Sequence, residues 1–72
     1  MDAVTMSVFI KGLTIAIGGM MPALAIGLIG RGAMEGIARN PEAKKEMNTP
    51  MLLGMAFAEA IAIYALIIAF SL

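Results

Sequence analysis

The chain has 72 residues, of which 61% are hydrophobic and 14% charged; its formal net charge is zero and its mean hydropathy is +0.96. A soluble domain of this size cannot bury so much apolar surface, because small chains bury the smallest fraction of their area. With no Cys and no His, disulfide staples and a Cys/His zinc site are excluded. Five Lys+Arg balance five Asp+Glu, which excludes a strongly basic nucleic-acid-binding protein. A membrane protein or an obligate subunit of an assembly remains.

The first apolar segment runs without a charge from Lys11 to Arg31 and reads GLTIAIGGMMPALAIGLIG. As a helix it reaches about 28 Å, close to the thickness of the hydrocarbon layer. Lipid offers no partners to free backbone groups, so the span must be helical. We expect a first transmembrane helix over about residues 5–38. A signal peptide fits less well, because the run is longer than such a segment and no cleavage site with a mature soluble domain follows.

The middle of the chain is polar and carries a helix start. Asn40 can cap a second helix, and Pro41 then stands at its first position, where the missing N–H costs nothing. The segment Asn48-Thr49-Pro50 is a competing start with the same logic. We favour the earlier start, which leaves Pro50 inside the helix.

The second apolar segment continues to the end of the chain with one ionisable group. We expect a polar loop at about 39–43 and a second transmembrane helix over about 44–71. Residues 1–72 then form one all-α transmembrane hairpin of two antiparallel helices.

The distribution of basic residues predicts the orientation of this hairpin. Four of the five lie in the central segment, and only Lys11 lies near an outer end. The positive-inside rule therefore places the loop in the cytoplasm and both termini outside. Without a transit peptide, we expect the inner (plasma) membrane of a bacterium, with an organelle-encoded protein as the alternative.

Small residues recur along the first span at helical spacing, and they let membrane helices approach closely. We expect two stripes about 150° apart, each packing against a neighbour in a closed ring of identical copies. Pro22 should bend this helix, because it frees the Gly18 carbonyl. The first stripe consists of Gly12, Ala16, Gly19, Ala23, Gly27 and Gly30, and the second of Gly18, Ala25, Gly32 and Gly36.

Glu59 stands alone near the middle of the second span. A charged carboxylate at that depth costs a few kcal/mol even on lenient scales, so hydrocarbon favours the protonated form. A carboxyl that is neutral in lipid and ionised beside a cation is a reversible proton carrier. The Tyr64 hydroxyl or the Phe57 carbonyl could bond the protonated group; the spacing equally allows both residues to serve in packing.

Taken together, these segments resemble the c subunit (proteolipid) of F-type ATP synthases, over essentially the whole length of the chain. Three features carry the resemblance together: the Gly/Ala-rich first span, the hinge ARNPEA, and LLGMAFAEAIAIYALIIAF with its central Glu. The resemblance implies a homo-oligomeric ring, with Glu59 as the carboxyl that binds the transported ion. It also implies an arginine of the a subunit opposite Glu59, and contact of Arg39, Asn40 and Pro41 with the gamma and epsilon subunits of the central stalk. Asn40 stands where many members have Gln.

The resemblance also bears on which ion is carried. Sodium-type members typically offer an oxygen at the first-helix position that is Ile26 here, and a Ser or Thr at the position of Ala60. A hard cation needs several oxygen ligands, so we expect proton transport, with a sodium-translocating ring as the alternative. Ile26 also implies a drier site, in which a bound water could replace the missing polar partner.

The sequence contains no enzyme constellation: it lacks a Cys or His nucleophile pair, a phosphate-binding loop and a pair of close carboxylates. We therefore expect no catalysis by this chain alone, no cofactor and no metal. Its expected role is that of a rotor subunit whose protonation drives rotation and ATP synthesis elsewhere in the complex. A structural or pore-forming membrane hairpin is the alternative from a different class.

Overall fold

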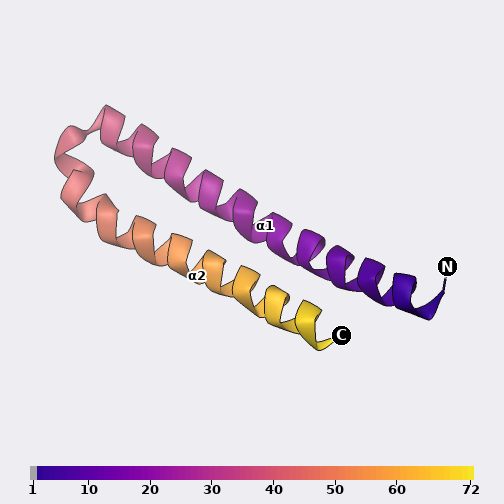
Figure 1. The fold of residues 1–72 in the computed structure, drawn as a ribbon. Coiled ribbons are helices and arrows are strands. Elements are labelled where there is room, and N and C mark those ends of the chain that lie inside the picture. Colours follow the sequence, from indigo (N-terminus) through magenta and orange to yellow (C-terminus); the bar gives the residue numbers. More distant parts are fainter. Residues whose placement is uncertain (1) are drawn as a thin grey trace.

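The computed structural model describes residues 2–72 and contains two long helices joined by a short turn. Helix α1 spans Ala3–Arg39, a single 3-10 turn η1 spans Pro41–Ala43, and helix α2 spans Lys44–Ser71. Figure 1 shows the helices lying side by side and antiparallel, with both ends of the chain at the same end of the hairpin. The described part of the chain is therefore an all-α hairpin, as the sequence predicts.

Both ends of α1 are closed by identifiable hydrogen bonds. At its start, the Asp2 Oδ1 accepts a bond of 2.7 Å from the Thr5 N–H, which satisfies one of the free amides of the first turn. At its end, the Asn40 N–H donates to the Gly36 carbonyl at 3.0 Å. The cap at Asp2 explains why the helix begins two residues before the expected position 5.

The turn corrects the expected role of Asn40. Its side chain makes no capping hydrogen bond, because the turn is closed by backbone groups. The Ala43 N–H donates to the Asn40 carbonyl at 2.9 Å, and Pro41 occupies the first position of η1. Pro50 lies inside α2, just as Pro22 lies inside α1, and both helices continue through their prolines.

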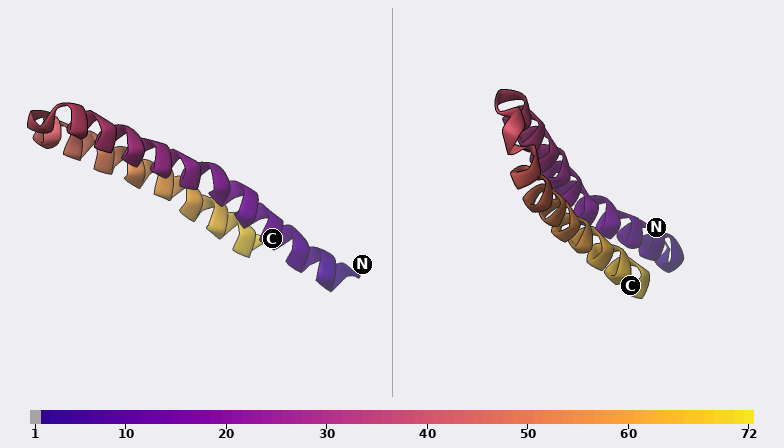
Figure 2. Two further views of the ribbon diagram at one scale, coloured as in Figure 1. Left: turned by 90° about the horizontal axis from the view of Figure 1, so that it is seen from above. Right: turned by 90° about the vertical axis from the view of Figure 1, so that its left-hand side faces the viewer.

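The hairpin is long and thin. Its Cα trace extends 58 × 17 × 8 Å, so it exceeds a hydrocarbon layer of about 30 Å and its ends reach water. Both helices are long and apolar enough to cross a membrane. Figure 2 shows that the hairpin is gently bowed and that the start of α1 projects beyond the end of α2.

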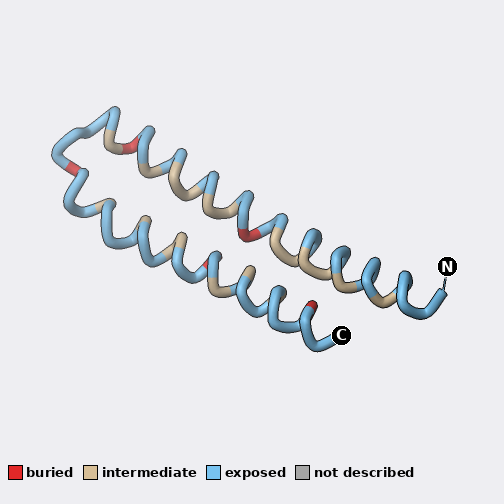
Figure 3. Tube along the Cα trace, viewed as in Figure 1, coloured by how far each residue is buried: buried red, intermediate tan, exposed pale blue. Residues whose placement is uncertain are grey.

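The buried positions of the hairpin are occupied by alanine, glycine and proline. Figure 3 shows the buried and half-buried positions following the facing sides of α1 and α2. Large apolar side chains instead cover the outside: Phe70 is 78% exposed. This apolar exterior suits lipid or further protein, not water. The buried residues are Pro22, Gly36, Ala43, Ala58 and Ala69.

Two glycines of α1 permit the closest approach of the helices. A Cβ added at Gly18 would lie 2.7 Å from the Cβ of Ala65, and one added at Gly36 would lie 2.6 Å from the Cε of Met47. Neither separation is compatible with ordinary van der Waals contact. The short Ala65 side chain cannot move out of the way at Gly18, so the interface requires glycine there, whereas the flexible end of Met47 can shift at Gly36.

The two expected stripes of small residues differ in what they face. In the second stripe, Gly18, Ala25 and Gly36 are buried or half-buried against α2, and only Gly32 has nothing within 4 Å of an added Cβ. Much of this stripe therefore packs inside the hairpin, and its contact with another copy stays a prediction. The first stripe is mostly exposed. It lies on one side of the hairpin, and we call this whole side, including the part formed by α2, the glycine flank.

Candidate ion-binding site

Glu59 projects from one side of the hairpin. It follows the buried Ala58 but is itself exposed. Met55, four residues earlier, lies on the same side of α2, and its Cε would be 3.0 Å from a Cβ on Gly30. Since Gly30 belongs to the glycine flank, Glu59 and the glycine flank share one side of the molecule.

The depth of Glu59 follows from the contacts between the helices. Gly18 lies opposite Ala65, and Ile29 lies opposite Gly54, so Glu59 is level with residues 24–26 of α1. Ile26 is half-buried and lies one turn before Gly30, on the same flank as Glu59. The structure thus brings Ile26 and Glu59 to one level and one side.

No basic residue lies at this level in residues 2–72. Arg31 is about 10 Å further along the helix axis, and Lys11 about 20 Å in the other direction, at 1.5 Å per residue. Arg31 is paired with Glu35, with Nε and Oε1 2.9 Å apart. Across the described chain, Glu59 makes no hydrogen bond or ion pair, so its carboxyl depends on groups outside the hairpin.

Within one hairpin, the structure brings neither the Tyr64 hydroxyl nor the Phe57 residue, whose carbonyl was the other expected partner, to the Glu59 carboxyl. At about 100° per residue, Phe57 is turned about 160° and Tyr64 about 140° from Glu59 around the helix axis. They lie on the opposite flank, where they are 69% and 65% exposed. The Phe57 carbonyl lies in the interior of α2, where the amide four residues on is its regular donor.

One feature near Glu59 was not predicted. A hollow of about 280 Å³ opens at its level on the flank that carries Phe57 and Tyr64. The hollow arises because small alanines of both helices meet beside a proline ring. The hollow depends on which residue of α1 lies opposite Ala58 of α2. No single stretch of sequence specifies this register, so the hollow could not be predicted from the sequence. Its walls are Met21, Pro22, Ala25, Ala58 and Ile61.

The hinge residues predicted to contact partners lie together at the closed end of the hairpin. Arg39 ends α1, Asn40 links the helices and Pro41 begins η1, and all three are exposed. The turn therefore presents one basic side chain and one amide beside a rigid proline, at the end farthest from the chain termini (Figure 1).

Comparison with known proteins shows which family has these features. Residues 9–72 match the family model of the ATP synthase c subunit. The chain belongs to the c-subunit family of ATP synthases. It is 44% identical over 68 residues to the ATP synthase c subunit of Dehalococcoides mccartyi, covering 94% of this chain and 90% of that protein. Identity is 45% over 58 residues with the Chloroflexus aurantiacus protein (81% and 76% covered) and 42% over 71 residues with that of Prochlorococcus marinus (96% and 88%).

Membership of the c-subunit family fixes the general role of the chain. It is an integral membrane component of the membrane sector of ATP synthase, with an ion-translocating role, and it is not an enzyme by itself. A protein of this family belongs to a ring of like copies within the larger complex. The hairpin supplies what this role needs: two spans, an exposed glycine flank and one carboxyl at mid-depth.

Proposed function

We propose that this chain is the proton-carrying rotor subunit of an F-type ATP synthase, and that Glu59 carries the proton. The observation that supports the proposal is a single carboxyl at the middle of two apolar spans, with no basic residue at its level in residues 2–72. In hydrocarbon the neutral acid is favoured. A cation alongside favours the ionised form, so the approach of a positive partner group releases the proton.

Rotation follows from the alternation of these two states. A protonated Glu59 can face lipid, whereas an ionised one is held beside the arginine of the a subunit. Each proton that enters neutralises one carboxyl and lets the ring advance by one copy. Torque passes to the gamma and epsilon subunits through the exposed turn at Arg39, Asn40 and Pro41, and the catalytic head makes ATP.

The ring contact joins unlike flanks of neighbouring copies. The glycine flank of one hairpin is flat, and the opposite flank carries exposed large side chains such as Ile17, Leu24 and Leu28. A contact between two different surfaces generates a ring when the rotation closes. In such a ring, Phe57 and Tyr64 of one copy lie toward Glu59 of the next, so a second copy completes the surroundings of the carboxyl.

The surroundings of Glu59 favour a proton over sodium. Ile26 presents a hydrocarbon side chain at the same level and on the same flank, and Ala60 adds no oxygen. Sodium needs several oxygen ligands, whereas a proton needs only the carboxyl. We infer that the loop faces the cytoplasm of a bacterium, because the basic residues gather at the closed end.

Carbodiimide labelling and substitution test the proposal in rings reconstituted with the other membrane-sector subunits. Carbodiimide should modify Glu59, block proton flow and react less at high pH, with no protection by sodium. Glu59→Gln should abolish transport while rings still assemble, and Glu35→Gln, which removes an exposed acid near the hinge, should transport normally. Sodium protection would indicate a sodium ring, and normal transport by Glu59→Gln would overturn the assignment of Glu59.

A further inference from the structure

The first turn of α2 carries opposite charges on opposite flanks of the hairpin. Lys44 and Glu46 are two residues apart, which turns them about 160° from each other around the axis and separates them by only about 3 Å along it. Between them, Met47 and Ala43 face α1: Ala43 is buried, and the Met47 sulfur packs at Gly36. Lys44 therefore lies on the glycine flank, and Glu46 lies on the other.

Neither charge is satisfied within the hairpin. The ion pair between Arg31 and Glu35 is the only one among residues 2–72, and neither Lys44 nor Glu46 makes a side-chain hydrogen bond there. Their positions on opposite flanks also prevent the two from meeting each other. Both side chains are exposed, so each is free to pair with a group from outside the chain.

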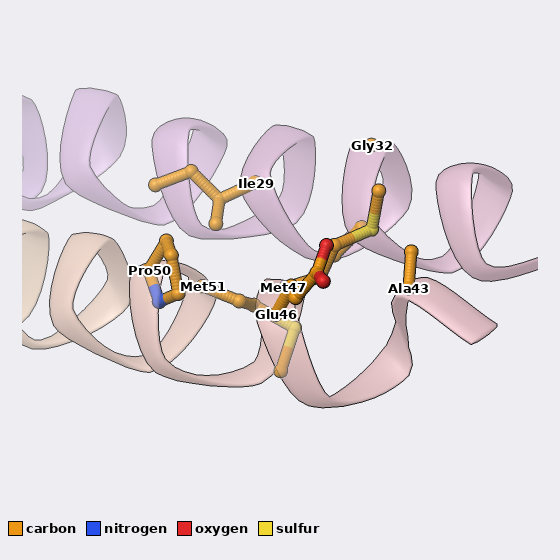
Figure 4. A pocket seen from close by; sticks show the side chains of 8 residues that line it. Ile29, Gly32, Ala43, Glu46, Met47, Pro50 and Met51 are labelled. Carbon is orange, nitrogen blue, oxygen red and sulfur yellow. The ribbon is translucent and has the colours of Figure 1, made fainter. Parts of the chain in front are cut away.

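Beside Glu46 lies an open groove with a volume of about 400 Å³. Figure 4 shows the Glu46 carboxylate at this groove, with its oxygens between the ribbons of α1 and α2. Gly32 leaves one wall open, since nothing lies within 4 Å of an added Cβ there. The other lining residues are Ile29, Ala33, Ala43, Met47, Pro50 and Met51.

An apolar groove with a carboxylate at its edge suits an aliphatic chain that ends in a cation. A lysine has this form, because its methylene stem lies along apolar surface while its ammonium reaches a polar partner. The position of Glu46 along the hairpin restricts which lysine can bind. The lysine must lie at the level of Glu46 and must belong to the surface that meets this flank.

We propose that Lys44 of one copy pairs with Glu46 of the next copy, with its stem lying across the groove. The inference rests on the ring of the proposed function, in which the glycine flank of one hairpin meets the opposite flank of its neighbour. That contact brings Lys44 and Glu46 together at nearly the same depth. Repeated between all neighbouring copies, this pairing forms a continuous circle of ion pairs at the hinge end of the spans.

Lys45 provides the matched control. It has the same charge and adjoins both residues in sequence, but it is turned about 160° from the inward-facing Met47. It is exposed on the side of α2 away from α1, so it faces neither flank. A variant at Lys45 changes the net charge equally without touching the proposed pair.

Disulfide cross-linking tests the proximity directly, because the native chain has no Cys. In oxidised membranes, Lys44→Cys with Glu46→Cys should give a ladder of linked oligomers that collapses on reduction. Lys45→Cys with Glu46→Cys should stay monomeric in denaturing gels. A Lys44/Glu46 double-cysteine ring that assembles but gives no ladder would overturn the pairing while leaving the ring itself standing.

Charge reversal tests whether the contact between Lys44 and Glu46 stabilises the ring. Lys44→Glu and Glu46→Lys alone should each lower the temperature at which the detergent-solubilised ring dissociates, and the two combined should restore it. Lys45→Glu should leave it unchanged. If the combined variant fails to recover, the lysine binds something else, such as a lipid phosphate, and the inference is wrong. Absence of any ring from the unmodified chain would instead contradict the proposed function and this inference together.

Discussion

The contact of Gly18 with Ala65 allows a quantitative test of how the hairpin holds together. A Cβ at residue 18 would lie 2.7 Å from the Ala65 Cβ, well inside the optimum of about 3.5–4.0 Å. Overpacking of this kind costs about 1–3 kcal/mol. Alanine regains about 1 kcal/mol through its better helix propensity. Gly18→Ala alone is therefore expected to lower the free energy of unfolding by up to about 2 kcal/mol.

Combining Gly18→Ala with Ala65→Gly isolates the energetic cost of the steric clash between the two Cβ atoms. With the Ala65 Cβ gone, the nearest neighbour of the new methyl is the Cα of residue 65 at 3.9 Å, an ordinary contact. Propensity changes cancel in the double-mutant cycle, so the coupling energy should be about 1–3 kcal/mol in favour of the double variant.

The assay is unfolding of the dissociated hairpin in mixed micelles, followed by the loss of helical circular dichroism as sodium dodecyl sulfate is added. Gly32→Ala is the control, because nothing lies within 4 Å of a Cβ there and the change should not destabilise the hairpin. If the Gly18 and Ala65 substitutions add within about 0.5 kcal/mol, the close approach does not carry the packing energy, and the reasoning is refuted.

Three further perturbations probe other parts of the hairpin. Gly36→Ala should cost less than about 1 kcal/mol in the same assay, because the atoms it meets are the flexible end of Met47, at 2.6 and 2.9 Å. Pro22→Ala restores a backbone donor to the carbonyl one turn earlier, so the new amide should be protected from hydrogen exchange in micelles. Hydrogen bonds from the Thr5 backbone N–H and side chain lower the pKa of Asp2. Because the pKa of Asp2 is lower in the folded state than in the unfolded state, the cap stabilises the helix fully at pH values above the unfolded pKa. This stabilisation is lost as the pH falls through the folded pKa, so the Thr5 amide should then exchange faster.

The fold class and the family were predictable from the sequence because strong, local constraints carry them. A run without charges from Lys11 to Arg31 must cross lipid as a helix, and a proline following Asn40 favours a new start there. The family hinge ARNPEA and the central Glu59 lie in continuous stretches that can be recognised without coordinates. For the same reason, the depth of Glu59 needed only the position of the two spans.

The roles of the small residues were not predictable in the same way. Helical periodicity gives the angle between two stripes, but it does not say which stripe faces α2. That choice depends on the register set by the turn, which brings Gly18 to Ala65 and Gly36 to Met47. Likewise, the spacing of Tyr64 from Glu59 allowed a contact, whereas the helix turns the two side chains to opposite flanks. Such relations belong to the packed hairpin, and no segment of the chain contains them alone.

The placement of Glu59 on the glycine flank links assembly to chemistry. Had the carboxyl faced α2, its protonation would be set inside one chain by fixed neighbours. Because it projects from a flank without an intrachain partner, whatever covers that flank controls its charge: another copy of the hairpin, lipid, or a cationic partner protein. In the proposed ring, the glycines let a second copy approach closely, and that copy would exclude water from around the carboxyl. On the proposed function, ring closure and proton affinity are therefore two consequences of one surface, and a substitution that loosens the flank should weaken both.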